Sequence, residues 1–307
     1  MNRNRRNLLR AGLGAAAAVS LGTLGSTAQA QAPTREHRIG HTGITWGYSA
    51  PNAEQAIADV ARLGFQGFES FGSVLESWES RGGLGRLLEA ANLPLVGAYC
   101  PMVLTDAARR RDEVAKISRW AGLIRKYGGR IAVIGPDNVD RASFDFGAAR
   151  ANIVATLNDI GAALADAGVV GALHQHTGSC ITTRDETYAV MESVNTDVMK
   201  LCPDTGELLA GGLDPVRVVR DFLGVVAHVH IKDYDGGDYN DGYCPVGKGR
   251  VDVAGVVDVL ESSDADFMIM AELNPNTRDM TAPATPFELA RSSRARFIEL
   301  GFGFPAG

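Results

Sequence analysis

The sequence predicts an α/β protein of the (β/α)8 barrel class, formed as a single domain. The first observation behind this prediction is an alternation, repeated eight times, of apolar β-branched runs with amphipathic stretches joined by short connections. The second is length. The 307-residue chain leaves 277 residues once its first 30 are set aside, and barrels of this class need about 250.

Residues 1–30 have the layout of an export signal. Two adjacent arginines, Arg5 and Arg6, precede a weakly hydrophobic run of Ala, Gly and Leu that ends at Ala28-Gln29-Ala30. Paired arginines at this place are typical of the twin-arginine signal. An ordinary secretory signal and an anchored helix are the alternatives, although the apolar run is short for a membrane span. We therefore expect a barrel domain over 31–307 that is periplasmic or otherwise exported.

Charge and cysteine usage narrow the partners of this domain. The first 30 residues hold four arginines and no acids, so residues 31–307 carry 26 basic and 36 acidic side chains, a formal charge near −10. Nucleic acid is a poor partner for such a surface, and no later stretch is apolar enough to insert into a membrane. The four cysteines lie far apart without a Cys-x-x-Cys pair, so isolated buried thiols are expected at least as readily as a disulfide.

The predicted strands are short apolar runs rich in β-branched residues. In chain order they are expected at 39–46, 67–71, 95–100, 131–135, 169–176, 198–204, 225–232 and 267–274. From the third to the eighth strand they recur at intervals of about 25 to 45 residues. This spacing leaves room for the crossover helix that a parallel connection needs.

The predicted helices are the amphipathic stretches that follow the strands. They are expected at 53–63, 84–91, 107–127, 146–167, 185–193, 215–222, 253–261 and 286–300. A strand followed by a helix, eight times over, favours a closed parallel barrel. A doubly wound open sheet is the alternative, but no Gly-x-Gly-x-x-Gly follows the first strand.

Polar residues recur where the predicted strands end, which is where barrels of this class carry their chemistry. His176, Asp204, His230 and Glu272 lie near the ends of the fifth to eighth strands, so their side chains can converge above the barrel mouth. Imidazole nitrogen together with carboxylate oxygen is a ligand set that suits Mn²⁺, Fe²⁺, Co²⁺ or Zn²⁺. Mg²⁺ and Ca²⁺ are better suited by an all-oxygen set, which is absent here. The sequence therefore predicts a site for one divalent metal ion.

Four stretches carry a resemblance to a known family. They are His174-Gln175-His176-Thr177-Gly178, Asp204-Thr205-Gly206, His228-Val229-His230-Ile231-Lys232-Asp233 and Pro245-Val246-Gly247-Lys248-Gly249. With Ile44-Thr45-Trp46-Gly47 they make nearly all of 31–307 resemble the xylose-isomerase-like TIM-barrel superfamily, which includes sugar isomerases, sugar epimerases and inosose dehydratases. The resemblance implies metal-dependent chemistry on sugars or cyclitols.

The resemblance also implies a ligand set. In that superfamily a Glu, an Asp, a His and a Glu on strands five to eight typically hold the metal. The last three match Asp204, His230 and Glu272, whereas His174 stands in place of the first, in a His-x-His arrangement like that of inosose dehydratases. His174 and His176 point to the same face of a strand, so either is a candidate ligand. With one carboxylate fewer, nitrogen-loving metals are favoured, and Mn²⁺ is expected, with Co²⁺, Fe²⁺ or Zn²⁺ as alternatives.

Five residues are candidates for catalysis in the mechanism that the resemblance implies. Glu272 or His174 would accept a proton from a carbon next to a carbonyl, and Lys232 would donate to the developing oxyanion or bind a substrate hydroxyl. Glu69 would bind a hydroxyl or act as a second base. Glu207, which replaces a usual His, is a further base or hydroxyl-binding group. The alternatives are a salt bridge for Lys232 and an exposed loop position for Glu207.

Two further residues are expected near the site. Trp46 would offer an apolar face to a sugar ring, with plain packing as the alternative. His228 lies one alternation deeper than His230, so we expect it to make a structural hydrogen bond inside the barrel.

These features predict a divalent-metal-dependent isomerase or epimerase that acts through an enediolate on a non-phosphorylated sugar or cyclitol. Phosphorylated sugars are mainly intracellular, and no glycine-rich phosphate cradle is evident. One alternative is a dehydratase or lyase acting on a keto-sugar or inosose, because one of the usual paired bases is missing. A second is a non-catalytic exported carbohydrate-binding barrel. A metal-dependent endonuclease of the same fold is disfavoured by the acidic charge.

Overall fold

The computed structural model describes residues 35, 37–265, 267–276 and 284–305. By its internal contacts the chain divides into a unit of residues 1–31 and a unit of residues 32–307, and all the described residues belong to the second. The predicted export signal lies outside the described residues.

The predicted barrel is confirmed, because eight parallel strands form one curled sheet. They are β1 (Ile39–Thr42), β2 (Phe68–Phe71), β3 (Leu95–Met102), β4 (Ile131–Pro136), β5 (Val170–Leu173), β6 (Met199–Leu201), β7 (Val229–Ile231) and β10 (Ile269–Ala271). Their order in the sheet is β6-β5-β4-β3-β2-β1-β10-β7. The parallel bridges Leu201–Val226 and Asp204–His230 join the two end strands, so the sheet curls back on itself.

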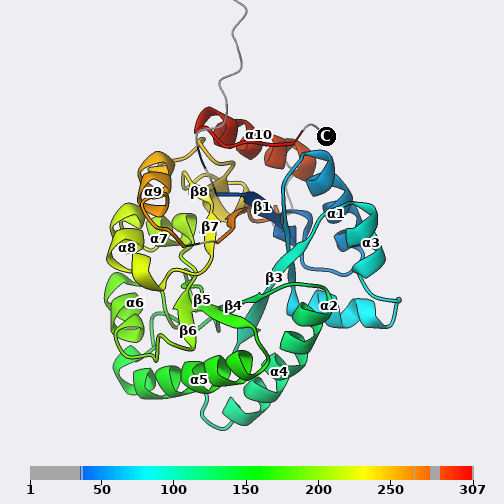
Figure 1. The fold of residues 1–307 in the computed structure, drawn as a ribbon. Helices are drawn as coiled ribbons and strands as arrows, with labels where there is room; N and C mark the ends of the chain where they lie inside the picture. The colour runs from blue at the N-terminus through cyan, green and yellow to red at the C-terminus, as the bar shows by residue number, and fades with distance from the viewer. Residues whose placement is uncertain (1–34, 36, 266, 277–283, 306–307) are drawn as a thin grey trace, which may run out of the picture. The chain divides into compact units, whose positions relative to one another are not determined.

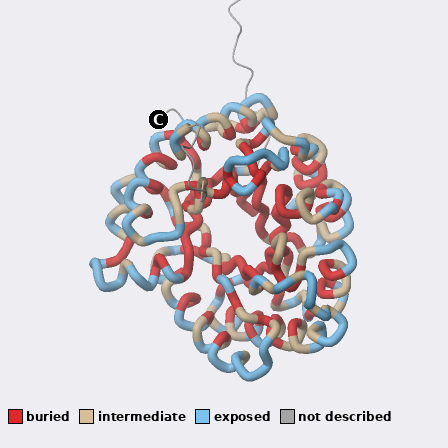
Figure 2. The backbone as a smooth tube through the Cα atoms, turned by 180° about the vertical axis from the view of Figure 1, so that it is seen from behind, coloured by how far each residue is buried: buried red, intermediate tan, exposed pale blue. Residues whose placement is uncertain are grey.

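Helices surround the strands of this unit (Figure 1). They are α1 (Asn52–Arg62), α2 (Gly72–Glu79), α3 (Gly85–Ala90), α4 (Arg110–Lys126), α5 (Phe146–Asp166), α6 (Arg184–Met191), α7 (Thr205–Ala210), α8 (Pro215–Asp221), α9 (Val253–Leu260) and α10 (Pro286–Glu299). Three 3-10 turns accompany them: η1 (Gly43–Trp46), η2 (Leu223–Val225) and η3 (Asn240–Gly242). In Figure 2 the inner strands are buried, whereas exposed residues follow the outer ring.

Several predicted elements end differently in the structure. The strand expected at 39–46 stops at Thr42, where η1 begins, and the strand expected at 169–176 stops at Leu173. Helices α2 and α7 were not predicted. Helix α2 has no side-chain cap, and its first residue, Gly72, approaches Trp120 so closely that a Cβ would lie 2.5 Å from the indole. Such a helix start depends on tertiary packing rather than on a local signal.

The packing combines an apolar layer between sheet and helices with a polar barrel interior. Ile57 and Val60 of α1 and Ile117 and Ile124 of α4 are representative of the buried apolar side chains. The polar side chains Glu69, His174, Asp204, His228, His230 and Lys232 are also fully buried. Because buried polar groups need partners, these residues point to a functional centre rather than to the core.

Two expectations about the domain's chemistry can be compared with the described residues. The four cysteines are free and buried, which confirms isolated thiols rather than a disulfide. In the described ranges, no helix combines the length and the apolar character that crossing a bilayer requires.

A small hairpin follows β7 and is organised by one carboxylate. Strand β8 (Asp233–Tyr234) pairs antiparallel with β9 (Tyr243–Cys244). The buried carboxylate of Asp233 accepts hydrogen bonds from the backbone N–H groups of Gly247 (2.9 Å), Gly249 (2.9 Å) and Val251 (3.0 Å). The motifs at 228–233 and 245–249 are therefore parts of one structure, because the first supplies the acceptor that shapes the second.

Replacing Asp233 by Ala is expected to lower the free energy of unfolding by about 3 kcal/mol, because several backbone donors lose a charged acceptor. Denaturant-induced unfolding followed by circular dichroism measures the effect. Asp264→Ala, which removes an exposed acid, is the control and should stay within about 0.5 kcal/mol of wild type. A change below about 1 kcal/mol for Asp233→Ala would show that the loop at 245–251 holds its shape without this carboxylate.

Candidate metal centre

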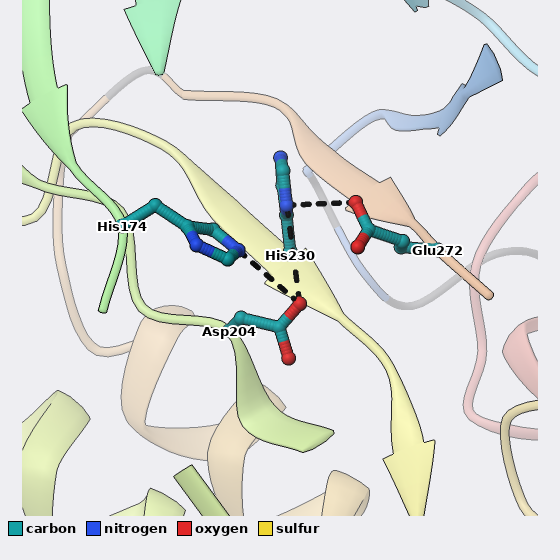
Figure 3. Close-up of side chains that lie close together, drawn as sticks. All are labelled: His174, Asp204, His230 and Glu272. Atoms are coloured by element: carbon teal, nitrogen blue, oxygen red, sulfur yellow. Dashed lines mark ion pairs between the residues drawn. The ribbon is translucent and has the colours of Figure 1, made fainter. Parts of the chain in front are cut away.

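Four side chains from strands that are neighbours around the barrel meet at the carboxyl end of the sheet (Figure 3). His174 directly follows β5, Asp204 follows β6 after two residues, His230 lies within β7 and Glu272 directly follows β10. All four are buried, and one ligand atom from each lies within 4.8 Å of the others. Asp204, His230 and Glu272 therefore converge as the sequence predicted, whereas His174 takes the place of His176 in the group.

The distances within this group match what one shared ion requires. His174 Nε2 lies 3.4 Å from Asp204 Oδ2, and His230 Nδ1 lies 4.0 Å from the same oxygen and 2.9 Å from Glu272 Oε2. Atoms that bind a single transition-metal ion at about 2.0–2.2 Å lie about 3–4 Å from each other. The group could therefore hold one metal ion without large rearrangement.

Unpaired atoms give the second test of fit. Both ring nitrogens of His174, Oδ2 of Asp204 and Nδ1 of His230 are buried and have no hydrogen-bond partner. A buried polar atom left without a partner costs about 1–3 kcal/mol. One nitrogen of His174, Oδ2 of Asp204 and Nδ1 of His230 fit a cation as their shared partner, because each can present a lone pair. Oδ2 also lies 3.2 Å from the Lys232 ammonium, and Nδ1 lies 2.9 Å from Glu272 Oε2.

Helix α7 explains why Asp204 points one oxygen at this group. Asp204 is the N-cap of α7, and its Oδ1 accepts a hydrogen bond from the backbone N–H of Glu207 at 2.8 Å. The Gln175 side chain also holds the Asp204 carbonyl, at 3.1 Å. The capping bond fixes the carboxylate, so Oδ2 remains turned toward His174 and His230.

The protonation of the two imidazoles is set by burial and by neighbouring charge. Burial lowers the pKa of His174, which favours the neutral ring, and a neutral ring has one nitrogen with a free lone pair. Burial alone would lower the pKa of His230 as well, but Cys202 and the carboxylates of Glu69 and Glu272 raise it well above its ordinary value. A proton and a metal ion would compete for the same nitrogen of His230, because metal binding requires the neutral ring.

Lys232 lies beside the group and is fully paired. Its Nζ contacts Glu207 Oε1 (2.9 Å), Glu272 Oε1 (3.0 Å) and Asp204 Oδ2 (3.2 Å), and it donates to Asn274 Oδ1 (3.1 Å). Burial alone would lower its pKa, but the three carboxylates raise it well above the ordinary value. Burial alone would raise the pKa of Glu272, but the charges of Lys232 and His230 lower it well below its usual range. The structure thus shows the salt bridges that were the alternative expectation for Lys232.

Glu207 and His176 form a second cluster next to the first. Glu207 is buried, contrary to an exposed loop position, and its Oε2 accepts from the backbone N–H of Thr177 at 3.0 Å. His176 lies outside the group of four. Its side chain is 33% exposed, and its Nε2 lies 3.4 Å from Glu207 Oε1. Of the two strand-five histidines, His174 is the one that the structure brings to Asp204 and His230.

Glu69 joins two histidines below the group. Its Oε2 lies 2.7 Å from His228 Nε2 and 3.1 Å from His230 Nε2, and all three side chains are buried. The hydrogen bond expected for His228 inside the barrel is therefore confirmed. Burial alone would raise the pKa of Glu69, but His230 and His228 lower it to about 2.

A pocket opens onto the group, and both His174 and Glu272 line it. Tyr48, Phe71 and Tyr99 supply its aromatic wall. Aromatic side chains with a few polar groups among them are typical of a small-molecule site. The sequence analysis did not predict these aromatic residues, because only polar residues were considered as candidates at the strand ends. The position of Phe71 and Tyr99 near the ends of predicted strands was the signal that could have found them.

Trp46, which was expected to face a sugar ring, does not line this pocket. Its indole Nε1 donates to Asp59 Oδ2 at 3.0 Å, and its ring packs edge-on against His41. The strand expected at 39–46 would have carried Trp46 to the barrel mouth, but the 3-10 turn η1 redirects the chain after Thr42. The alternative expectation of packing describes Trp46 better.

Comparison with known proteins places this geometry in a family. Residues 57–296 match the family described as xylose isomerase-like TIM barrel. Inosose dehydratase of Clostridium botulinum is 27% identical over 191 residues, which cover 59% of this chain and 63% of that protein, so this alignment spans less than two thirds of the relative's length. Inosose dehydratase of Clostridium beijerinckii is 22% identical over 277 residues, covering 82% of this chain and 90% of the relative.

A solved structure shares the fold. The crystal structure described as IOLI protein with a binding zinc atom superposes with a TM-score of 0.70 at 16% identity, covering 87% of this chain and all of that one. The family match extends over most of the chain and includes every strand except β1, so the chain belongs to the xylose isomerase-like TIM barrel family.

Proposed function

We propose that this protein is a divalent-metal-dependent isomerase or epimerase of a non-phosphorylated sugar or cyclitol, exported by means of residues 1–30. The observation that carries the proposal is the buried group of His174, Asp204, His230 and Glu272, which opens onto a pocket that His174 and Glu272 line. The named relatives are enzymes that act on an inosose, which supports the cyclitol class.

The four residues would hold one ion, and Mn²⁺ is the metal we propose, with Co²⁺, Fe²⁺ or Zn²⁺ as alternatives. When bound, the ion supplies a Lewis acid that polarises a carbonyl and its neighbouring hydroxyl. Its ligands carry two negative charges, from Asp204 and Glu272, and two neutral imidazoles.

The chain's own groups would move the proton and hold the substrate. Glu272 lines the pocket and would accept a proton from the carbon beside the carbonyl, because His174 would give its single lone pair to the ion. Lys232 keeps a full positive charge between the carboxylates and would stabilise negative charge that develops on oxygen. Tyr48, Phe71 and Tyr99 would cover the substrate and exclude water from the reacting carbon.

The pocket wall favours a substrate without phosphate. Among the described residues that line the pocket there is no Lys or Arg, and the charged or ionisable groups are Glu69, Glu272 and the two strand-five histidines beside tyrosines. A phosphate group would meet acidic side chains rather than cationic donors. Hydroxyl groups, in contrast, find both donors and acceptors there.

A dehydratase or lyase acting on a keto-sugar or inosose is the second candidate, and the placement of His176 favours it. His176 lines the pocket, its Nδ1 lies 2.8 Å from the Thr177 carbonyl and its Nε2 lies 3.4 Å from Glu207 Oε1. Both ring nitrogens thus face acceptors, so His176 would donate a proton to a hydroxyl that leaves as water. A non-catalytic carbohydrate-binding barrel remains the third candidate.

One experiment separates the three candidates. The Mn²⁺-loaded protein is incubated in D₂O with keto-sugars and inososes, and products are followed by NMR. Deuterium incorporation with isomer formation supports the isomerase or epimerase, and loss of water with formation of an unsaturated ketone supports the dehydratase. Binding without deuterium exchange or product would favour the non-catalytic barrel.

His174→Glu is expected to change the metal preference. The substitution adds a third negative charge and replaces nitrogen by oxygen, so the affinity ratio of Mg²⁺ to Zn²⁺ should rise at least about tenfold. Calorimetric titration with each metal measures the ratio, and His176→Glu serves as the matched control. If the ratio changes in His176→Glu and not in His174→Glu, the metal ligand is His176 and our assignment of His174 is wrong.

A further inference from the structure

Glu69 is an unusual neighbour for a catalytic pocket, because both of its near contacts are imidazoles from one strand region. It comes from β2, whereas His228 directly precedes β7 and His230 is the middle residue of β7. The same oxygen, Oε2, lies 2.7 Å from His228 Nε2 and 3.1 Å from His230 Nε2. All three residues are buried, so these contacts are shielded from solvent.

We propose that Glu69 is a positioning residue that fixes the tautomer and ring orientation of His230, with His228 holding Glu69 in place. The two ring nitrogens of His230 lie on opposite partners, with Nδ1 on the side of Asp204 and Glu272 and Nε2 on Glu69. When Nδ1 gives its lone pair to a metal ion, the proton of the neutral ring lies on Nε2. Glu69, which accepts hydrogen bonds when ionised, is placed to accept that proton's hydrogen bond.

The direction of that lone pair completes the argument. His230 Nδ1 lies 2.9 Å from Glu272 Oε2 and 4.0 Å from Asp204 Oδ2, on the side of the ring where the proposed ligand atoms gather. In Figure 3 one ring nitrogen of His230 points to Glu272 and Asp204, while the other lies at the opposite end of the ring. Glu69 thus directs the proton to one side of the ring and leaves the lone pair for a metal ion on the other.

His228 has a part in this arrangement that simple packing does not explain. Its hydrogen bond to Glu69 is the shorter of the two, and it shares the oxygen that His230 uses. A carboxylate held by two donors has less freedom to turn toward the pocket that Glu69 also lines. We therefore assign Glu69 to the support of His230 rather than to the hydroxyl-binding or base role considered from the sequence.

This inference rests on the proposed function, since it presumes that His230 binds a metal ion. Partners that hydrogen-bond a ligating histidine typically change metal affinity by about 10–100-fold when they are mutated. Glu69→Gln keeps the shape of the side chain and removes the charge. It should weaken Co²⁺ binding by about 10–100-fold and alter the visible absorption of bound Co²⁺, while the unfolding transition remains cooperative.

Glu113→Gln is the matched control, because Glu113 is also a buried carboxylate, with Val103 N–H and Lys116 as its partners away from the site. It should leave the Co²⁺ dissociation constant within about twofold of wild type. If Glu69→Gln does not fold, His228→Leu tests the same arrangement and should weaken Co²⁺ binding about 3–10-fold, since Glu69 then loses one of its two donors.

The outcomes separate this inference from the proposed function. If wild type binds Co²⁺ and Glu69→Gln, or His228→Leu in its place, binds it with unchanged affinity and absorption, the positioning role is wrong and the proposed function stands. If the affinity is unchanged but turnover falls, Glu69 acts on the substrate instead. If wild type binds no Co²⁺, both are overturned.

Discussion

Asp204→Asn combined with His230→Gln is expected to yield a folded protein that binds no Mn²⁺ or Co²⁺ and whose turnover is below about one thousandth of wild type. The double variant removes one of the two negative ligand charges and one of the two imidazoles, so the remaining pair cannot hold an ion against water. Turnover falls with the metal, because the Lewis acid that polarises the carbonyl is lost.

This pair of substitutions was chosen to spare the fold. Asn is as good an N-cap as Asp, so the hydrogen bond from the Glu207 N–H that starts α7 can persist. Metal content by mass spectrometry of the purified protein and calorimetric titration measure the loss. Asp214→Asn with His37→Gln is the control, since Asp214 caps α8 and His37 lies away from the site. Wild-type metal content in the Asp204 and His230 variant would contradict the assignment of the ligands.

Lys232→Met should have the second largest effect, and it should act on stability as well as on turnover. Removing the ammonium leaves Asp204, Glu207 and Glu272 buried without their shared cation. Breaking a buried ion pair by removing one partner costs about 3–5 kcal/mol. The free energy of unfolding without metal should fall by that amount, and turnover should drop about 10²–10³-fold, because the positive charge that would stabilise negative charge developing on oxygen is lost.

Metal should restore part of the stability of Lys232→Met, because an ion bound to Asp204 and Glu272 supplies positive charge that the variant lacks. Thermal unfolding with and without Mn²⁺ tests this, and the metal-induced rise in Tm should be larger for Lys232→Met than for wild type. Lys126→Met, which breaks an exposed pair with Glu79, is the control and should cost no more than about 1 kcal/mol. Equal stability of Lys232→Met and wild type without metal would show that the ammonium does not hold the carboxylates together.

Much of this architecture could be predicted from the sequence, because hydrophobic periodicity is a local property. The eight apolar runs correspond to β1–β7 and β10, and the eight amphipathic stretches correspond to α1, α3–α6 and α8–α10. The residue types near the ends of the fifth to eighth strands also sufficed to predict that Asp204, His230 and Glu272 converge, since parallel strands end on one side of a barrel.

What could not be predicted depends on contacts between distant segments. The choice between His174 and His176 follows from where β5 ends, and β5 ends at Leu173, three residues before the expected boundary. The chain then turns so that His176 meets Glu207 instead of Asp204. Helix α7 is only six residues long, and its N-cap, Asp204, is also the last residue of the strand expected at 198–204. Hydrophobic periodicity therefore gave no signal for this helix.

The role of Glu69 was open for a related reason. A glutamate at the end of a strand reads equally as a base, a hydroxyl-binding group or a support for another side chain. The structure distinguishes these roles, because it places the imidazoles of His228 and His230 on Oε2 of Glu69. Trp46 was misjudged because η1 interrupts an apolar run that looked like continuous strand.

The central claim is that His174, Asp204, His230 and Glu272 hold one metal ion, and anomalous X-ray scattering from a Co²⁺-loaded crystal tests it most directly. The account predicts a single strong peak about 2.0–2.3 Å from one ligand atom of each of the four residues. A peak between His176 and Glu207, or no peak at the carboxyl end of the barrel, would contradict it.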